Sequence, residues 1–279
     1  MRPAALLGAL TLAGCGSTLP ATAPLPLHGV VSLDYCADQM VLGLVPTKRI
    51  RAVSPEADSD THFSVPRAHG ITRVRPTLED IAALRPRYAV RSYGGAPGID
   101  RQLSALGITV VQLGYTARLA DVAPELARVG TALDAGPRAT ALADSFRATL
   151  AAISAQAETN RPTLLYITPG DVTTGGDGFV GDVIRAAGFR SVRTQPGWGS
   201  LPIEAMVRRP PGAVLRAFFD SERYRQDRWA SSAHPALRRV VADAPVATVP
   251  GSTLACGNWL AGDALRALTT LRQRAKTSS

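Results

Sequence analysis

Residues 30–44 read VVSLDYCADQMVLGL, and this stretch sets the fold class. Its first residues form a short apolar run typical of a buried strand, residues 37–45 have the spacing of a helix, and a polar loop carrying Cys36 separates the two. The same order of strand, loop and helix recurs over 88–106 and over 164–187. Because strands that alternate with helices form parallel sheets, the sequence predicts an α/β protein.

A long Ala-rich amphipathic segment, residues 137–157, begins with a proline and divides the two series of units. As a helix it would be about 30 Å long, enough to cross a whole domain. We therefore expect two parallel-sheet α/β lobes joined by one long interlobe helix. The expected boundaries are 28–134 for the N-terminal lobe, 135–160 for the interlobe helix and 161–279 for the C-terminal lobe.

The first residues predict export. Met1 and Arg2 precede an apolar stretch that is too short to span a bilayer, and the stretch ends in LAGC (12–15), which resembles the lipobox of bacterial lipoproteins. We expect a signal peptide over 1–15, lipid on Cys15, a flexible Pro/Ala/Thr-rich tether over 16–27 and a periplasmic body held at a membrane. An ordinary secretory peptide with an incidental cysteine is the alternative, and which membrane holds the anchor stays open.

Composition excludes several classes of function. The 31 Lys and Arg residues exceed the 22 Asp and Glu residues by nine, but they are dispersed without a block of like charge among aromatics, so nucleic-acid binding is not expected. The basic excess suits an anionic membrane or ligand. The four histidines are scattered and no CxxC occurs, which disfavours a protein metal site.

No catalytic set is recognised, so an enzyme is not expected. Residues 176–181 satisfy GxGxxG, but residues 169–175 separate them from the preceding strand, and the tight turn of a dinucleotide site is missing. We interpret 176–181 as a glycine-rich cleft loop. The chain also lacks a GxSxG elbow and a P-loop.

One element occurs once in each predicted lobe. Residues 77–90 read TLEDIAALRPRYAV and residues 202–215 read PIEAMVRRPPGAVL, and in both a glutamate in the first helical turn stands seven residues before a proline. Singly, Glu79 or Glu204 would be a helix-start residue that complements the helix dipole. Together they suggest two carboxylates presented on the same face of the molecule.

These segments, in this order and spacing, make the whole mature chain similar to the periplasmic substrate-binding proteins of ABC importers for cobalamin, ferric siderophores and haem. The resemblance rests on VVSLDYCADQMVLGL, PTLEDIAALRPRYAV, SYGG (92–95), LGITVV (106–111), the interlobe helix and QPGWGSLPIEAMV (195–207). It implies a monomer of two rigid lobes with the ligand in a cleft between them. The ligand would be a cobalt or iron chelate, with no resident cofactor. Glu79 and Glu204 would dock onto arginines of a permease dimer that works with ATPase subunits.

The cleft is expected at the loops that follow the strands, where ligands of parallel α/β folds bind. Gly94 and Gly95 would let backbone amides approach the ligand, and Trp198 stands where the cobalamin-binding members carry a cleft tryptophan. Arg91 favours an anionic chelate or haem and Trp198 favours a corrinoid, so the ligand stays open. The predicted ligand-binding residues are Tyr35, Cys36, Arg91, Tyr93, Trp198, Asp220 and Trp259.

Two cysteines, Cys36 and Cys256, fall on predicted cleft loops of different lobes. A disulfide requires their Cα atoms to approach within about 7 Å. Alternatively, one or both thiols face the ligand and coordinate iron or cobalt. The disulfide is favoured because free thiols are at risk in an oxidising compartment.

Two other functions remain as alternatives: a lipid-anchored metal-cofactor scavenger or sensor that is not coupled to a permease, and an enzyme on the same fold. The paired glutamates favour the importer, since a scavenger needs no permease contact.

Overall fold

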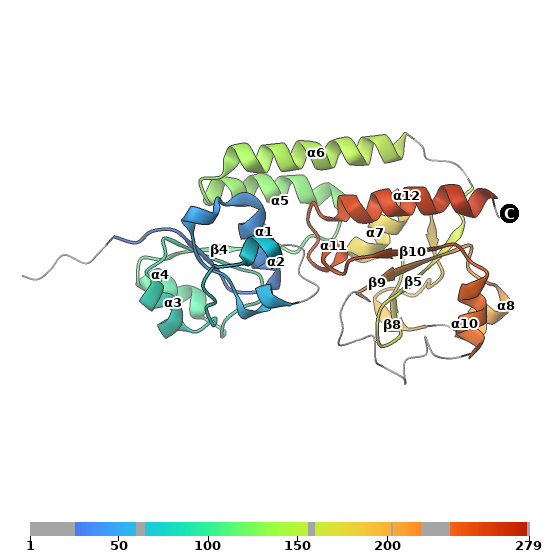
Figure 1. The fold of residues 1–279 in the computed structure, drawn as a ribbon, viewed down its shortest axis with the longest axis horizontal. Helices are drawn as coiled ribbons and strands as arrows, with labels where there is room; N and C mark the ends of the chain where they lie inside the picture. The colour runs from blue at the N-terminus through green and yellow to red at the C-terminus, as the bar shows by residue number, and fades with distance from the viewer. Residues whose placement is uncertain (1–25, 60–64, 156–159, 202, 219–234, 278–279) are drawn as a thin grey trace, which may run out of the picture.

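Two α/β lobes lie side by side in the computed structural model, which describes residues 26–59, 65–155, 160–201, 203–218 and 235–277 (Figure 1). The predicted signal peptide, Cys15, most of the predicted tether and Asp220 lie outside these residues. None of the described helices is both long and apolar enough to cross a membrane.

The N-terminal lobe is built on a four-stranded parallel sheet in the order β2-β1-β3-β4. Side chains of its strands alternate between two buried clusters, as expected for a sheet covered on both faces. The strands are β1 (Val30–Ser32), β2 (Ile50–Ala52), β3 (Tyr88–Arg91) and β4 (Thr109–Gln112). The helices are α1 (Tyr35–Leu44), α2 (Val65–Ala68), α3 (Leu78–Leu84) and α4 (Ile99–Ala105), with 3-10 turns at Thr47–Arg49 and Pro55–Asp58.

The C-terminal lobe repeats this plan with a parallel sheet in the order β10-β9-β5-β7, to which an antiparallel pair, β6-β8, is added. The strands are β5 (Thr163–Ile167), β6 (Val172–Thr174), β7 (Arg190–Ser191), β8 (Trp198–Ser200), β9 (Ala213–Ala217) and β10 (Val246–Val249). The helices are α7 (Gly178–Ala186), α8 (Ile203–Arg208), α10 (Pro235–Ala242), α11 (Ser252–Ala255) and α12 (Ala261–Thr277). The predicted two-lobed α/β architecture is therefore confirmed.

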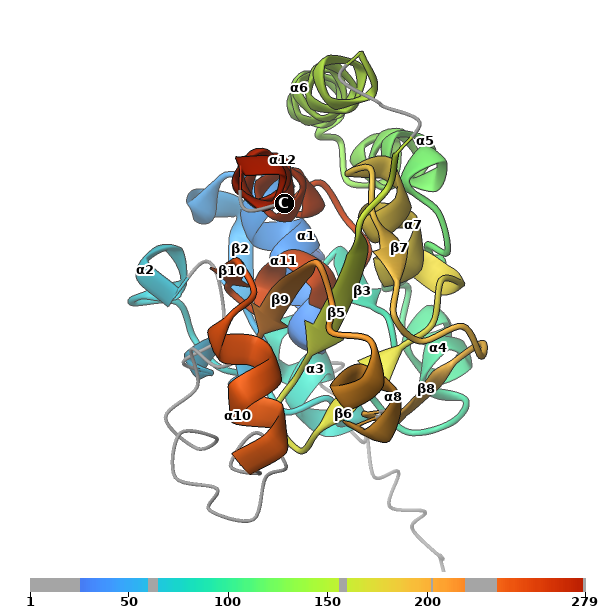
Figure 2. The same cartoon turned by 90° about the vertical axis from the view of Figure 1, so that its right-hand side faces the viewer.

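The lobes are bridged by a helical hairpin rather than by a single helix. The predicted interlobe helix is α6 (Gly136–Ser154), and it packs along α5 (Leu119–Ala132), which the sequence analysis did not predict. The interior Pro124 disrupts the usual helix signal of α5. Figures 1 and 2 show α6 as the outermost helix, with α5 and α12 between it and the sheets.

The close approach of α5 and α6 requires a glycine, Gly130, at their contact. A Cβ added to Gly130 in α5 would lie 2.3 Å from the Cβ of Ala139 in α6. Gly130 and Ala139 are both buried, and the two helices belong to a core cluster that includes residues of both lobes. The hairpin is thus part of a hydrophobic core shared by the lobes.

Two glycine-to-alanine substitutions should therefore have different effects on the free energy of unfolding. We expect Gly130→Ala to lower the free energy of unfolding by about 1–3 kcal/mol, because the added methyl group forces the helices apart. A Cβ at Gly136, the first residue of α6, meets nothing within 4 Å, so Gly136→Ala should be neutral or stabilise by up to about 1 kcal/mol. Urea unfolding measures both changes, and equal changes would contradict the close packing.

Candidate functional site

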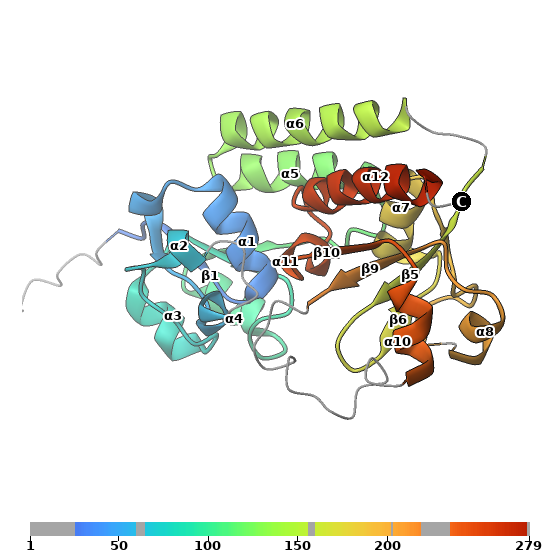
Figure 3. The same cartoon turned by 45° about the vertical axis from the view of Figure 1, so that its right-hand side comes forward.

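One face of helix α1 forms the contact between the lobes. Cys36, Gln39, Met40 and Gly43 have the i, i+3, i+4, i+7 spacing that aligns side chains along one side of a helix. Figure 3 shows α1 next to α11 at the junction of the lobes. Cys36 at the start of this face is joined to Cys256 by a disulfide, with their Cα atoms 5.4 Å apart. The disulfide is the favoured one of the two arrangements expected from sequence.

Two buried amides continue the contact between the lobes. Asn258 Nδ2 donates to Gln39 Oε1 at 2.5 Å, and Gln39 Nε2 donates to the carbonyl of Ser252 at 3.3 Å. Gln39 and Asn258 are almost fully buried. Because an unpaired buried amide is costly, this mutual pairing holds the lobes in one relative position.

Trp259, one of the predicted ligand-binding residues, lies at the end of this contact and does not line the cavity. The side chain is half-buried and packed against the shared core. A Cβ on Gly43 would lie 2.4 Å from the edge of the Trp259 ring, so the ring packs directly on the α1 backbone. The residues around Trp259 in the sequence give no sign of this contact, because Gly43 belongs to the other lobe and is distant in sequence.

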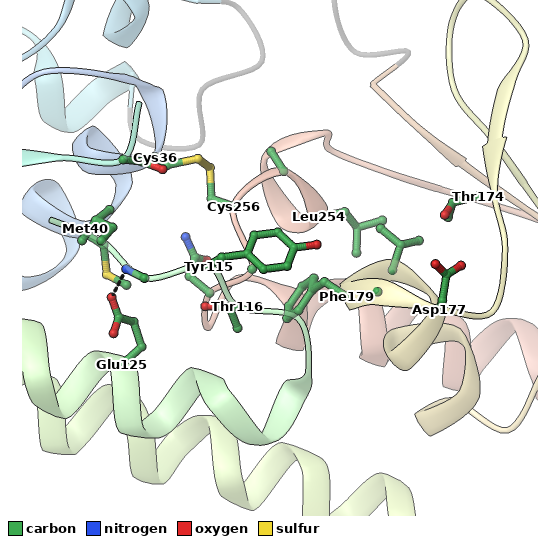
Figure 4. Close-up of a pocket in the computed structure, with 18 of the residues that line it drawn as sticks. Cys36, Met40, Tyr115, Thr116, Glu125, Thr174, Asp177, Phe179, Leu254 and Cys256 are labelled. Carbon is green, nitrogen blue, oxygen red and sulfur yellow. Dashed lines mark hydrogen bonds between the residues drawn. A yellow bond between two sulfur atoms is a disulfide. The ribbon is translucent and has the colours of Figure 1, made fainter. Parts of the chain in front are cut away.

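A cavity of about 520 Å³ opens between the lobes beside the disulfide (Figure 4). Its size is typical of small-molecule sites. Both lobes contribute loops that follow their strands, as the parallel α/β architecture predicts. The lining residues from the N-terminal lobe and α5 are Cys36, Met40, Ser92, 112–116 and Glu125, and those from the C-terminal lobe are Thr174, 177–180, Gly197, Trp198 and 254–258.

Three aromatic side chains, Tyr115, Phe179 and Trp198, line this cavity. Tyr115, in the loop after β4, is 88% exposed, and Trp198 is 57% exposed. Figure 4 shows Tyr115 extending from its loop toward Phe179 at the start of α7. Large exposed rings in a concave site offer flat surfaces on which an apolar ligand face can stack.

The ionised groups of the cavity wall are carboxylates. Glu125 Oε1 accepts the Gly114 amide at 2.8 Å and the Arg128 guanidinium at 2.7 Å. Each carboxylate oxygen of Asp177 accepts the Gly197 amide at 3.0 Å. No arginine, lysine or histidine lines the described part of the cavity, although the chain carries a formal charge of +9.

Asp34 positions the loop that brings Ser92 to the cavity. Its Oδ1 accepts the amide of Ala37 and caps α1, while Oδ2 accepts the amides of Ser92, Tyr93 and Gly94 at 2.6–3.1 Å. Asp34 is fully buried, so these bonds tie the ends of β1 and β3 together away from solvent.

A second buried carboxylate, Asp38, fixes the same end of α1. It accepts the backbone amide of Ser54 at 2.9 Å, the Ser54 hydroxyl at 2.6 Å and the Ser32 hydroxyl. Burial raises the pKa of Asp38 to about 6 despite these hydrogen bonds. Asp34 and Asp38 thus both stabilise the backbone at the start of α1 through buried hydrogen bonds.

Gly94 serves the scaffold and not the ligand, contrary to the expectation from sequence. A Cβ on Gly94 would lie 2.2 Å from the carbonyl oxygen of Leu33. The glycine is therefore required by the close approach of the loop to the backbone after β1.

Among the remaining predicted ligand residues, Cys36 and Trp198 line the cavity, but Tyr35 and Tyr93 do not. These two tyrosines line a neighbouring groove on the other side of Ala255. Glu56 Oε2 accepts both the Tyr93 hydroxyl and the Tyr35 amide at 2.9 Å.

Arg91, another predicted ligand residue, does not line the cavity. Arg91 is still part of β3, so its side chain shares the strand face of Ala89, which packs in the cluster with α3 and α4 residues.

Sequence reasoning missed Tyr115, Glu125 and Leu254. Tyr115 follows a strand that was recognised, so the rule for strand ends could have found it. The same rule could not have found Glu125, because Glu125 lies on α5, a helix that the sequence did not predict. Asp177 and Phe179 belong to the glycine-rich loop that was expected at the cleft, and they do line the cavity.

A family model described as periplasmic binding protein matches residues 30–228. The chain belongs to this family. A comparison with curated protein sequences gave no match.

Solved structures with a similar fold include three proteins whose alignments cover about 90% of this chain. The periplasmic heme-binding protein RhuT from Roseiflexus sp. RS-1 has a TM-score of 0.68 at 20% identity, over 89% of this chain and 99% of its own. The periplasmic heme-binding protein HutB of Vibrio cholerae gives 0.69 at 16%, over 90% and 98%. The periplasmic vitamin B12 binding protein BtuF of Vibrio cholerae gives 0.63 at 19%, over 90% and 98%. At these identities the likeness establishes the two-lobed fold of a periplasmic binding protein.

In this periplasmic binding protein, the disulfide should account for a large part of the stability. We expect Cys36→Ser with Cys256→Ser to lower the free energy of unfolding by about 2–5 kcal/mol, because the bond closes a loop across a sequence separation of 220. Urea unfolding of the variant should coincide with that of the wild-type protein in reductant. An unchanged midpoint of the wild-type protein in reductant would contradict the bond.

Proposed function

We propose that this periplasmic binding protein is the substrate-binding component of an ABC importer and that its substrate is a metal chelate of the corrinoid class. The observation that carries the proposal is the cavity wall of aromatic rings and carboxylates without a described cation. Similar structures include both heme-binding and vitamin B12 binding proteins, so the fold alone does not choose between them.

Charge is the argument for a corrinoid. Haem carries two propionate carboxylates, and many ferric siderophores are anionic, so either would bring negative charge toward Asp177, while the charge of Glu125 is already paired with Arg128. The repulsion would be stronger inside a partly dehydrated cavity than in water. A corrinoid instead has a rim of neutral carboxamides, whose N–H groups can donate to these carboxylates. Tyr115 and Trp198 can stack on its apolar surfaces.

Coupling to a permease is supported by the two matched glutamates. Glu79 on α3 and Glu204 on α8 are both exposed. Figures 1 and 2 show the two helices toward opposite ends of the molecule, on the side facing away from α6. We infer that these carboxylates dock onto arginines of the permease dimer, with its ATPase subunits attached. Cleavage before Cys15 would leave this cysteine as a lipidated N-terminus, and the lipid would keep the monomer close to that membrane complex.

Ligand titration tests the substrate class. We expect cyanocobalamin to quench tryptophan fluorescence saturably with a submicromolar dissociation constant, while haemin and ferrichrome bind at least tenfold more weakly. Quenching is corrected for absorption by the coloured ligands. Trp198→Phe should remove most of the quenching, because Trp198 lines the cavity. Tighter binding of haemin or ferrichrome would refute the corrinoid assignment, and absence of binding by all three would favour a scavenger or sensor with a different ligand.

Docking is tested separately from binding. Glu79→Ala with Glu204→Ala should leave cyanocobalamin affinity unchanged but reduce transport and ligand-stimulated ATPase activity at least tenfold, because charge pairs at an interface couple by about 1.5–7 kcal/mol. The cognate permease in proteoliposomes provides the measurement. Asp144→Ala with Asp263→Ala removes two exposed carboxylates from α6 and α12 and serves as the matched control. Equal activity of the two double variants would exclude docking through Glu79 and Glu204.

A further inference from the structure

A tyrosine hydroxyl lies buried without a partner behind the cavity. Tyr166 in β5 is 1% exposed, and its hydroxyl has no hydrogen-bond partner in the described structure. Buried tyrosine hydroxyls normally find one. Tyr88 in β3 is the contrasting case, because its hydroxyl donates to Asp134 Oδ2 at 2.8 Å. The described residues therefore supply no hydrogen-bond partner for the Tyr166 hydroxyl.

Tyr166 lies directly behind a side chain of the cavity wall. Its ring packs against that of Trp198, with the centroids 6.0 Å apart and the planes tilted by 59°. Trp198 lines the cavity, and so do Phe179 and Val180, which belong to the same buried cluster as Tyr166. The Trp198 ring thus contacts Tyr166 and also borders the cavity.

Trp198 lies in strand β8, which pairs with β6, so the movement open to Trp198 is rotation of its side chain. Trp198 stands between Gly197, whose φ is +74°, and Gly199. The backbone of Gly197 is held at three points: its amide donates to Asp177, and its carbonyl accepts from Arg193 Nε at 3.3 Å and from the Gly175 amide at 3.2 Å. Asp177 also lines the cavity. A ligand N–H group that competes for Asp177 would weaken one of these three attachments.

We propose that the Tyr166 hydroxyl is a ligand-binding group concealed by Trp198, and that it donates a hydrogen bond to a carbonyl oxygen on the ligand rim when the indole turns aside. Burial raises the pKa of Tyr166, so the hydroxyl keeps its proton and acts as a donor. A carboxamide offers both required groups, since its N–H can engage Asp177 and its carbonyl can accept from Tyr166. This inference rests on the proposed function of the cavity as a corrinoid site.

Two tyrosine-to-phenylalanine variants separate a ligand role from a structural role. Tyr166→Phe should bind cyanocobalamin about tenfold more weakly than the wild-type protein, the effect of losing one hydrogen bond to the ligand. Its Tm should be unchanged or higher, because the lost hydroxyl had no partner in the free protein. Tyr88→Phe, the matched control, should have normal affinity and a lower Tm, because it loses its bond to Asp134.

The cover provided by Trp198 is tested without ligand. Tetranitromethane should leave Tyr166 unmodified in the wild-type protein and nitrate it in Trp198→Ala, as located by mass spectrometry. Continued protection of Tyr166 in Trp198→Ala would overturn the proposed cover.

The binding results also distinguish this inference from the proposed function. If wild-type protein binds cyanocobalamin and Tyr166→Phe binds it within twofold as tightly, the ligand role of Tyr166 is overturned while the corrinoid assignment stands. A lower Tm of Tyr166→Phe would assign a structural partner to the hydroxyl and likewise overturn the ligand role. If wild-type protein does not bind cyanocobalamin, the corrinoid assignment fails and the role of Tyr166 fails with it.

Discussion

The contact between helix α1 and the segment 252–259 is the constraint on which the rest of the structure depends. A covalent bond, a buried amide pair and an aromatic ring packed on a glycine follow one another along a single helix face. Each restricts a different motion, since the disulfide fixes separation, the amides fix register and the ring fixes the approach of the backbones. Together with the core shared through α5, α6 and α12, they hold the two lobes as one unit.

A rigid junction gives the cavity a preformed shape, and this lowers the conformational entropy that a ligand must remove on binding. The cavity lies directly beside the junction, with the disulfide as part of its wall. Adaptation to a ligand is then confined to side chains, of which that of Trp198 is the clearest case. Two carboxylates, Asp177 and Glu125, lie in the wall of this cavity in an otherwise basic chain.

Differences between the sequence interpretation and the structure have a common physical origin. Arg91 lies away from the cavity because it still belongs to β3, where its side chain shares the face of Ala89. Trp259 and Gly94 lie in segments whose composition is typical of binding loops. In the structure Trp259 packs on Gly43, and Gly94 packs on the backbone of Leu33. Both contacts join segments distant in sequence, so local pattern cannot distinguish them from contacts to a ligand.

The sequence by itself determined the α/β class, the two lobes, the long helix, the matched pair of helices carrying Glu79 and Glu204, and the location of the cleft at strand ends. These features follow from apolar periodicity and from the geometry of parallel sheets, which are local or repetitive. Only the tertiary structure decided that Cys36 meets Cys256, that the cavity wall is acidic and aromatic, and that Tyr166 lies hidden behind Trp198. Those outcomes depend on side-chain direction and on contacts between the two halves of the chain, and both are fixed only when the lobes pack against each other.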